Sequence, residues 1–195
     1  MSYIVRGNEQ AMSEQTKFKQ TKIGKIPEDW EDGDLFVEVI LNFTQEEKFI
    51  LENDLNERTI SHKLAEYLQK YFQDYNVDCE YNRMRSGNMD KNYITKTLDL
   101  NLAYSRSNST NAITVFPDII VHKRGDNNSN YLIIEYKKKK FADKKRKNST
   151  ETYREFDKRK LCAYTKDLRY ELGIYLELDK DEVSELKFFK DEKEL

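Results

Sequence analysis

Residues 113–122 are Ile-Thr-Val-Phe-Pro-Asp-Ile-Ile-Val-His, and residues 131–137 are Tyr-Leu-Ile-Ile-Glu-Tyr-Lys. Both runs are rich in β-branched and aromatic residues, and a polar loop at residues 123–130 separates them, which predicts an antiparallel hairpin. Three charged residues, Asp118, Glu135 and Lys137, occupy strand positions that usually carry apolar side chains. The triplets after Asp118 and before Glu135 are wholly apolar, which is typical of central strands covered on both faces.

The spacing of these charged residues brings two carboxylates together. If His122 faces Tyr131 across the hairpin, the antiparallel register places Asp118 opposite Glu135, with Cβ atoms about 4.5–5.5 Å apart. Two carboxylates at that distance repel each other unless a cation lies between them. Because side chains alternate along a strand, Lys137 points to the same face as Glu135. The pattern predicts a site for a hard divalent ion such as Mg²⁺, which binds one or two carboxylates together with substrate phosphate.

The order Pro117-Asp118, a step of seventeen residues, then Glu135-Tyr136-Lys137 resembles the signature of the PD-(D/E)XK nuclease superfamily, which includes many restriction endonucleases. The resemblance implies a phosphodiesterase in which Asp118 and Glu135 bind Mg²⁺, with Mn²⁺ as a substitute, and Lys137 is catalytic. The alternative is an edge hairpin whose charged side chains face solvent and prevent aggregation.

A helix is predicted from about residue 56, because Ile60, Leu64, Leu68 and further apolar residues follow at helical spacing. Glu57 lies on the same stripe at the start of this helix. It either complements the helix dipole or, as the resemblance implies, approaches the metal as a further acid. A shorter helix is predicted to begin at Thr44, since residues 44–47 form a capping-box sequence.

A second long helix is expected after Ser149 or Thr150, either of which suits an N-cap, and Gly173 is expected to end it. Asp157, Lys160 and Tyr164 share one face of this helix. Some branches of the superfamily place Gln-x-x-x-Tyr here, and this chain has lysine instead of glutamine. The resemblance implies that Lys160 and Tyr164 support the substrate phosphate. The alternative for Asp157 and Lys160 is an ordinary surface ion pair.

Basic residues cluster directly after the proposed catalytic lysine. Beyond Lys137 itself they are Lys138, Lys139, Lys140, Lys144, Lys145, Arg146 and Lys147. Such a cluster neutralises phosphates and gives salt-sensitive affinity for nucleic acid that does not depend on sequence. The alternative is a solvated surface loop. The polar stretch at residues 83–111 is a further candidate for a binding loop.

Residues 17–31 contain a Gly-x-Ile-Pro-x-x-Trp sequence, from Gly24 to Trp30. It resembles the opening of the specificity subunit of type I restriction systems, and this likeness implies docking to a protein partner of such a system. The alternative is an N-terminal arm packed on its own domain. We therefore divide the chain into an arm with a docking segment at residues 1–43 and a nuclease-like domain at residues 44–195.

Composition limits the other classes of function. The chain has 195 residues and a formal net charge of −2, which excludes a globally basic protein. Cys79 and Cys162 are far apart in sequence, which argues against a zinc site and suits a reducing cytoplasm. No apolar run reaches membrane-spanning length, so no membrane partner is expected. The oligomeric state stays open, with a homodimer among the choices.

The predicted elements, with strands at residues 75–81, 174–178 and 186–189, follow the order helix, three strands, helix, strand. This is the αβββαβ core of the restriction endonuclease-like fold, an α/β class with a mixed central sheet flanked by helices. The sequence thus predicts a Mg²⁺-dependent endonuclease acting on DNA in prokaryotic restriction or phage defence. The alternatives are a non-cleaving module of the same fold that binds nucleic acid or a protein partner, and a ribonuclease.

Overall fold

The fold is built around a mixed sheet of six strands. The computed structural model describes residues 16–86, 93–100 and 112–195. The strands are β3 (Asn76–Cys79), β8 (Ile119–Lys123), β9 (Asp126–Lys138), β10 (Leu172–Asp179), β11 (Glu182–Lys190) and β12 (Lys193–Glu194). They lie side by side in the order β12, β11, β10, β9, β8, β3, and among them only β9 and β10 are parallel. The expected α/β class with a mixed central sheet is confirmed.

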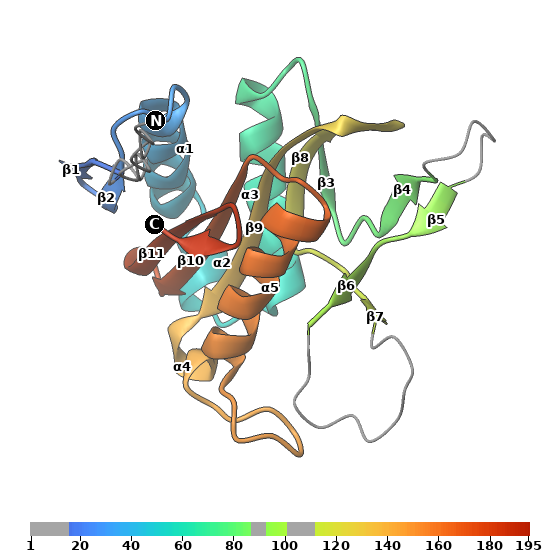
Figure 1. The fold of residues 1–195 in the computed structure, drawn as a ribbon. Helices are drawn as coiled ribbons and strands as arrows, with labels where there is room; N and C mark the ends of the chain where they lie inside the picture. The colour runs from blue at the N-terminus through green and yellow to red at the C-terminus, as the bar shows by residue number, and fades with distance from the viewer. Residues whose placement is uncertain (1–15, 87–92, 101–111) are drawn as a thin grey trace, which may run out of the picture.

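Helices cover both faces of this sheet. In Figure 1, α5 (Tyr153–Asp167) lies in front of the sheet and α3 (Glu57–Tyr71) lies behind it. Ile119 and Ile134 belong to the core that also holds the apolar residues of α3 and of α1 (Gly33–Glu46). Ile120 and Ile133 pack instead with Leu161 of α5. Alternation along each strand thus sends neighbouring residues to opposite, fully buried faces, as expected for central strands.

The register of the central hairpin matches the expected one next to the charged residues. Three pairs have the predicted index sum: Ile119 with Ile134, Ile120 with Ile133, and Val121 with Leu132. The register then shifts, and His122 pairs with Asn130 and not with Tyr131 as predicted. The shift lies at the far end of the strand, so it leaves the position of Asp118 and Glu135 unchanged.

The prediction of a polar loop at residues 123–130 is wrong. Lys123 pairs with Asp126, so only Arg124 and Gly125 form the turn, and β9 begins at Asp126. Gly125 has a φ of +82°, a conformation that side chains rarely adopt, and this permits the tight turn. The asparagines and serine that follow continue the strand, because tertiary pairing with β8 overrides their weak intrinsic preference for strands.

The two predicted long helices are present, with corrected ends. Asn56 caps α3 by accepting a hydrogen bond from Thr59 N at 2.8 Å. Thr152 caps α5, in place of the predicted Ser149 or Thr150, because Glu155 stands three residues later and completes a capping box.

The predicted helix end at Gly173 is wrong as well, since α5 ends at Asp167 and Gly173 lies inside β10. A Cβ on Gly173 would lie 3.2 Å from Phe189 Cβ and 3.3 Å from a methyl of Leu161. The glycine therefore permits close packing of α5 on the sheet and does not terminate the helix. The predicted strands at residues 174–178 and 186–189 are present within β10 and β11.

The predicted start of a helix at Thr44 is wrong, because Thr44 lies inside α1 and its hydroxyl donates to the carbonyl of Leu41 at 3.1 Å. Buried residues at helical spacing, among them Phe36, Val39, Ile40 and Phe43, extend this helix upstream of the capping-box sequence. The short α2 (Lys48–Glu52) follows. Residue 44, at which the sequence analysis divided arm from domain, therefore falls within a continuous helix.

The segment that precedes α1 packs on the same core. It forms a hairpin of β1 (Phe18–Thr21) and β2 (Gly24–Pro27), in which Ile26 is fully buried. The Trp30 ring centroid lies 5.3 Å from that of Phe36 and 5.7 Å from that of Phe188. Of the two readings of this segment, an arm packed on its own domain agrees with these contacts.

Two short ribbons branch from the sheet beyond β3 (Figure 1). One pairs β4 (Arg83–Arg85) with β5 (Tyr93–Thr95), and the other pairs β6 (Thr97–Asp99) with β7 (Ala112–Thr114). The remaining helix, α4 (Lys139–Ala142), follows β9 directly. Among the described residues, no helix combines the length and apolar character needed to cross a membrane.

Candidate active site

Two carboxylates meet where β8 begins. Asp118 immediately precedes β8, and continuing the register of Ile119 with Ile134 by one step places it opposite Glu135 on β9. Asp118 Oδ2 accepts a hydrogen bond from Tyr136 N at 2.9 Å. Glu135 is 1% exposed, and burial, with a further contribution from the charge of Asp118, raises its pKa. The structure thus brings together the two acids that the sequence predicted as neighbours.

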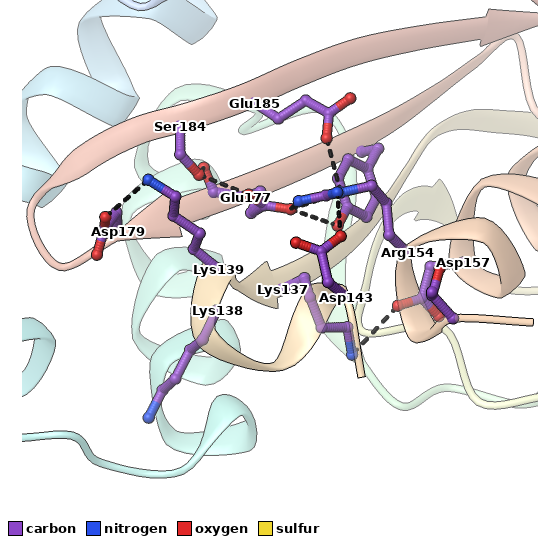
Figure 2. A network of polar contacts seen from close by, with 12 residues as sticks. Lys137, Lys138, Lys139, Asp143, Arg154, Asp157, Glu177, Asp179, Ser184 and Glu185 are labelled. Carbon is purple, nitrogen blue, oxygen red and sulfur yellow. Dashed lines mark hydrogen bonds and ion pairs between the residues drawn. The ribbon is translucent and has the colours of Figure 1, made fainter. Parts of the chain in front are cut away.

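Lys137 lies on the same face of β9 as Glu135, and acids from two helices hold its ammonium group. Lys137 Nζ is 3.2 Å from Glu57 Oε2 and 3.1 Å from Asp157 Oδ2. Figure 2 shows the contact with Asp157. Glu57, the first residue of α3, also accepts from the backbone N–H of Lys138 at 3.0 Å. Glu57 therefore belongs to this cluster, and its contact with the cluster is the ion pair with Lys137.

Helix α5 closes the cluster from above the sheet. Lys160 Nζ lies 2.6 Å from Glu135 Oε2 and 2.9 Å from Asp157 Oδ1. Asp157 is 4% exposed and the Lys160 side chain 12% exposed, so they do not form the surface pair considered as an alternative. The sequence placed Asp157 on the same helix face as Lys160 and Tyr164, but it was assigned no role in the site. Its spacing from two buried residues, four before Leu161 and seven before Tyr164, was the signal that it points inward.

Burial and neighbouring charges shift the pKa values of this cluster in opposite directions. Burial raises the pKa of Asp118 to about 6 and raises that of Glu135 well above its usual range, although Lys160 opposes both shifts. Burial alone would lower the pKa of Lys137, but Asp157 and Glu57 outweigh it and raise the pKa to about 12. The pKa of Lys160 is also raised, because Glu135, Asp157 and Asp118 outweigh its burial. Both lysines therefore carry their charge at neutral pH.

The donor atoms of the cluster suit a hard divalent cation. All the anionic donors are carboxylate oxygens, and Glu135 Oε1 is buried without a hydrogen-bond partner among the described residues. Mg²⁺ is often bound by only one or two protein carboxylates, with water and substrate phosphate completing its shell. Within residues 16–86, 93–100 and 112–195, no three His, Cys, Asp or Glu side chains form a group that could hold a metal ion. Lysine ammonium groups lie between the acids.

Tyr164 lies one turn further along α5 and is fully buried, at 0% exposure. Its hydroxyl makes no hydrogen bond of good geometry with a described residue, but it interacts with the carboxylate of Glu135. Burial raises the pKa of Tyr164, and the charges of Glu135 and Asp118 and the contact with Glu135 add to the shift. In this structure Tyr164 belongs to the inner wall of the cluster. It does not reach a surface that a nucleic acid could contact directly.

A second polar network fixes the start of α5. Arg154 Nη2 lies 2.8 Å from Glu177 Oε2 on β10, and its Nε lies 2.9 Å from Glu185 Oε2 on β11. The hydroxyls of Tyr175 and Ser184 also donate to the carboxylate of Glu177, at 2.9 and 2.8 Å. Figure 2 shows Glu177 at the centre of this network. The network anchors the helix that carries Asp157 and Lys160 onto the sheet.

Much of the basic cluster is already paired with acids. Lys138 is buried, and its ammonium contacts Asp54 at 2.9 Å and the carbonyl of Leu55. The other paired members are Lys139 with Asp179, Lys140 with Asp54, and Arg146 with Glu151. Lys144, Lys145 and Lys147 are exposed and form no ion pair with a described residue. Fewer basic side chains are therefore free to contact nucleic acid than the sequence predicted.

Comparisons with protein families, with curated proteins and with solved structures found no match.

Proposed function

We propose that this protein is a metal-dependent endonuclease that hydrolyses phosphodiester bonds in DNA. The main observation that supports this proposal is that Asp118, Glu135 and Lys137 converge on one face of β8 and β9, beneath α5. When the two ribbons β4–β5 and β6–β7 and the short α4 are left aside, the order α3, β3, β8, β9, α5, β10 supports assigning the αβββαβ core of the restriction endonuclease-like fold. The proposed activity follows from the site, because one fold can carry many functions.

Asp118 and Glu135 are the residues that would hold Mg²⁺, or Mn²⁺ in its place. When bound, such an ion polarises a phosphoryl oxygen and lowers the pKa of a bound water. Lys137 keeps its proton at neutral pH, so we assign it to positioning the attacking water and stabilising negative charge on the phosphate. Glu57 and Asp157 fix the ammonium of Lys137 from two sides.

DNA is the proposed partner because exposed cations lie close in sequence to the cluster. Lys144, Lys145 and Lys147 follow α4, which begins directly after β9. Their contacts would be to phosphates, and the resulting affinity would fall steeply with salt concentration.

A role in prokaryotic restriction or phage defence rests on the sequence resemblance of residues 17–31 alone. A restriction-system protein is accordingly the proposed partner, and the cytoplasm the proposed location. Since Ile26 is buried, such a partner would contact the exposed side chains of the β1–β2 hairpin, among them Lys25.

A plasmid-cleavage assay tests the enzymatic proposal. We expect the protein with Mg²⁺ or Mn²⁺ to nick or linearise supercoiled DNA. The Asp118→Asn variant should lose on the order of 10²–10³-fold in rate, because a catalytic metal supplies several kcal/mol of transition-state stabilisation. Asp34→Asn is the matched control, since Asp34 is an exposed aspartate paired with Lys19 outside the site.

A non-cleaving nucleic-acid-binding module is the second candidate, and one observation favours it: the ammonium of Lys160 already forms an ion pair with Glu135, one of the two proposed metal carboxylates. Binding of DNA without metal-dependent scission would establish this candidate and refute the enzyme. Adding competing structured RNA to the same assay distinguishes a ribonuclease from a DNA endonuclease, because a ribonuclease would cleave the RNA in preference to the plasmid.

A further inference from the structure

We propose that Lys160 is an internal counter-ion that competes with the divalent metal for the carboxylate of Glu135. The inference rests on the proposed function, since it concerns the same site. It assigns to Lys160 a role in setting metal affinity, in addition to any contact with substrate.

The geometry places the ammonium of Lys160 where a cation bound to Glu135 would be held. Its Nζ contacts Glu135 Oε2 at 2.6 Å and Asp157 Oδ1 at 2.9 Å. The second oxygen of Glu135 is buried and accepts no hydrogen bond of good geometry from a described residue, although the hydroxyl of Tyr164 interacts with this carboxylate. Glu135 therefore offers a metal one open oxygen and one that the lysine holds.

Two cations cannot share this carboxylate without cost. The cluster is buried, with Glu135 at 1% and Asp157 at 4% exposure, so water screens little of the repulsion between an ammonium and a divalent ion. The long flexible stem of a lysine allows the ammonium group to withdraw while the backbone stays in place. Metal binding at Glu135 would thus displace Lys160, and the energy of the broken ion pair lowers metal affinity.

Lys137 shares Asp157 with Lys160, but its second partner is Glu57 and not Glu135. Its ammonium lies between Glu57 and Asp157, and no ion pair among the described residues joins it to Asp118 or Glu135. A metal at Asp118 and Glu135 would therefore take no carboxylate from Lys137, whereas it would take Glu135 from Lys160. The two lysines therefore have different roles: Lys137 stays in place for catalysis, and the ion displaces Lys160.

Titration calorimetry with Mn²⁺, in the absence of nucleic acid, tests the proposal. We expect Lys160→Gln to bind Mn²⁺ at least tenfold more tightly than the wild type. Lys158→Gln is the matched control and should bind like the wild type, because Lys158 lies on the same helix and pairs at 2.6 Å with Glu185, outside the cluster. Equal or weaker binding by Lys160→Gln would refute the competition and leave the proposed nuclease standing.

A second pair of variants covers the case in which Lys160→Gln fails to fold. Asp157→Asn and Asp157→Asn/Lys160→Gln differ only in whether Lys160 is present. The double variant removes one negative and one positive charge. The double variant should bind Mn²⁺ at least tenfold more tightly than Asp157→Asn, and equal affinities would refute the proposal. Absence of Mn²⁺ binding in every folded variant would refute both this inference and the metal-dependent nuclease.

Discussion

Lys96 is a buried lysine outside the site that forms no ion pair with a described residue. Lys96 is 1% exposed, and its ammonium donates to the hydroxyl of Tyr170 at 2.8 Å. It also lies over the rings of Tyr81 and Tyr170, at 5.2 and 5.4 Å from their centroids. Aromatic faces compensate only part of the lost hydration. Burial therefore lowers the pKa of Lys96 to about 8.

This shift predicts a pH-dependent stability that Lys96→Met should abolish. Between the folded pKa of about 8 and an ordinary value near 10.5, the unfolded chain binds more protons than the folded one. The free energy of unfolding should then rise with pH, by about 1.4 kcal/mol per unit at most. Urea unfolding at pH 7.5 and 9.5 measures the effect, and the methionine variant serves as the reference. A difference between the two proteins that stays constant with pH would contradict the prediction.

At the scale of one element, α5 carries Asp157 and Lys160 of the charged cluster, and its position depends on Arg154. This arginine joins the first turn of α5 to two neighbouring strands through Glu177 and Glu185. Glu177 is 1% exposed, so it relies on Arg154 for its compensating positive charge. The orientation of Asp157 and Lys160 over the sheet follows from this anchor.

Removal of that anchor should destabilise the fold strongly. Arg154→Met leaves the carboxylate of Glu177 buried without a cation, which costs about 3–5 kcal/mol. The double variant Arg154→Met/Glu177→Gln should recover part of the loss, because it removes the uncompensated charge as well. Denaturant unfolding of both variants measures the difference. A single variant no less stable than the double one would show that the ion pair contributes little.

Across the whole molecule, one hydrophobic core joins the N-terminal hairpin, α1, α3 and the back of the sheet. Ile26 of β2 and Phe36 of α1 belong to the same buried cluster as Leu64 of α3 and Ile134 of β9. A cluster shared in this way makes residues 16–46 part of the unit that folds cooperatively.

The Ile26→Ala variant tests whether the N-terminal hairpin unfolds cooperatively with the rest of the core. Ile26 is 0% exposed, and its truncation should lower the free energy of unfolding by about 2–5 kcal/mol within one transition. Ile94→Ala is the matched control, because Ile94 is 46% exposed and should cost less than about 1 kcal/mol. If the transition of the Ile26 variant splits in two, or remains at the wild-type midpoint, the hairpin is independent of the core.

The sequence by itself determined the apolar centres of the two middle strands and the two acids that stand opposite each other on them. The apolar triplets after Asp118 and before Glu135 indicated strands covered on both faces, and alternation placed Glu135 and Lys137 on one side. These features depend on neighbours along the chain, so the local pattern contains them. The positions of α3 and α5 follow approximately for the same reason, whereas α1 was not predicted.

Only the tertiary structure decided how the charges are paired. Lys160 meets Glu135 across 25 positions and Lys137 meets Glu57 across 80, and such contacts depend on how helices pack on the sheet. Packing also buried Tyr164 and joined residues 16–43 to the main core. Local periodicity shows which face of an element is buried. The partner of a buried charge is set by the close packing of distant segments, because a charge without a partner is too costly to bury.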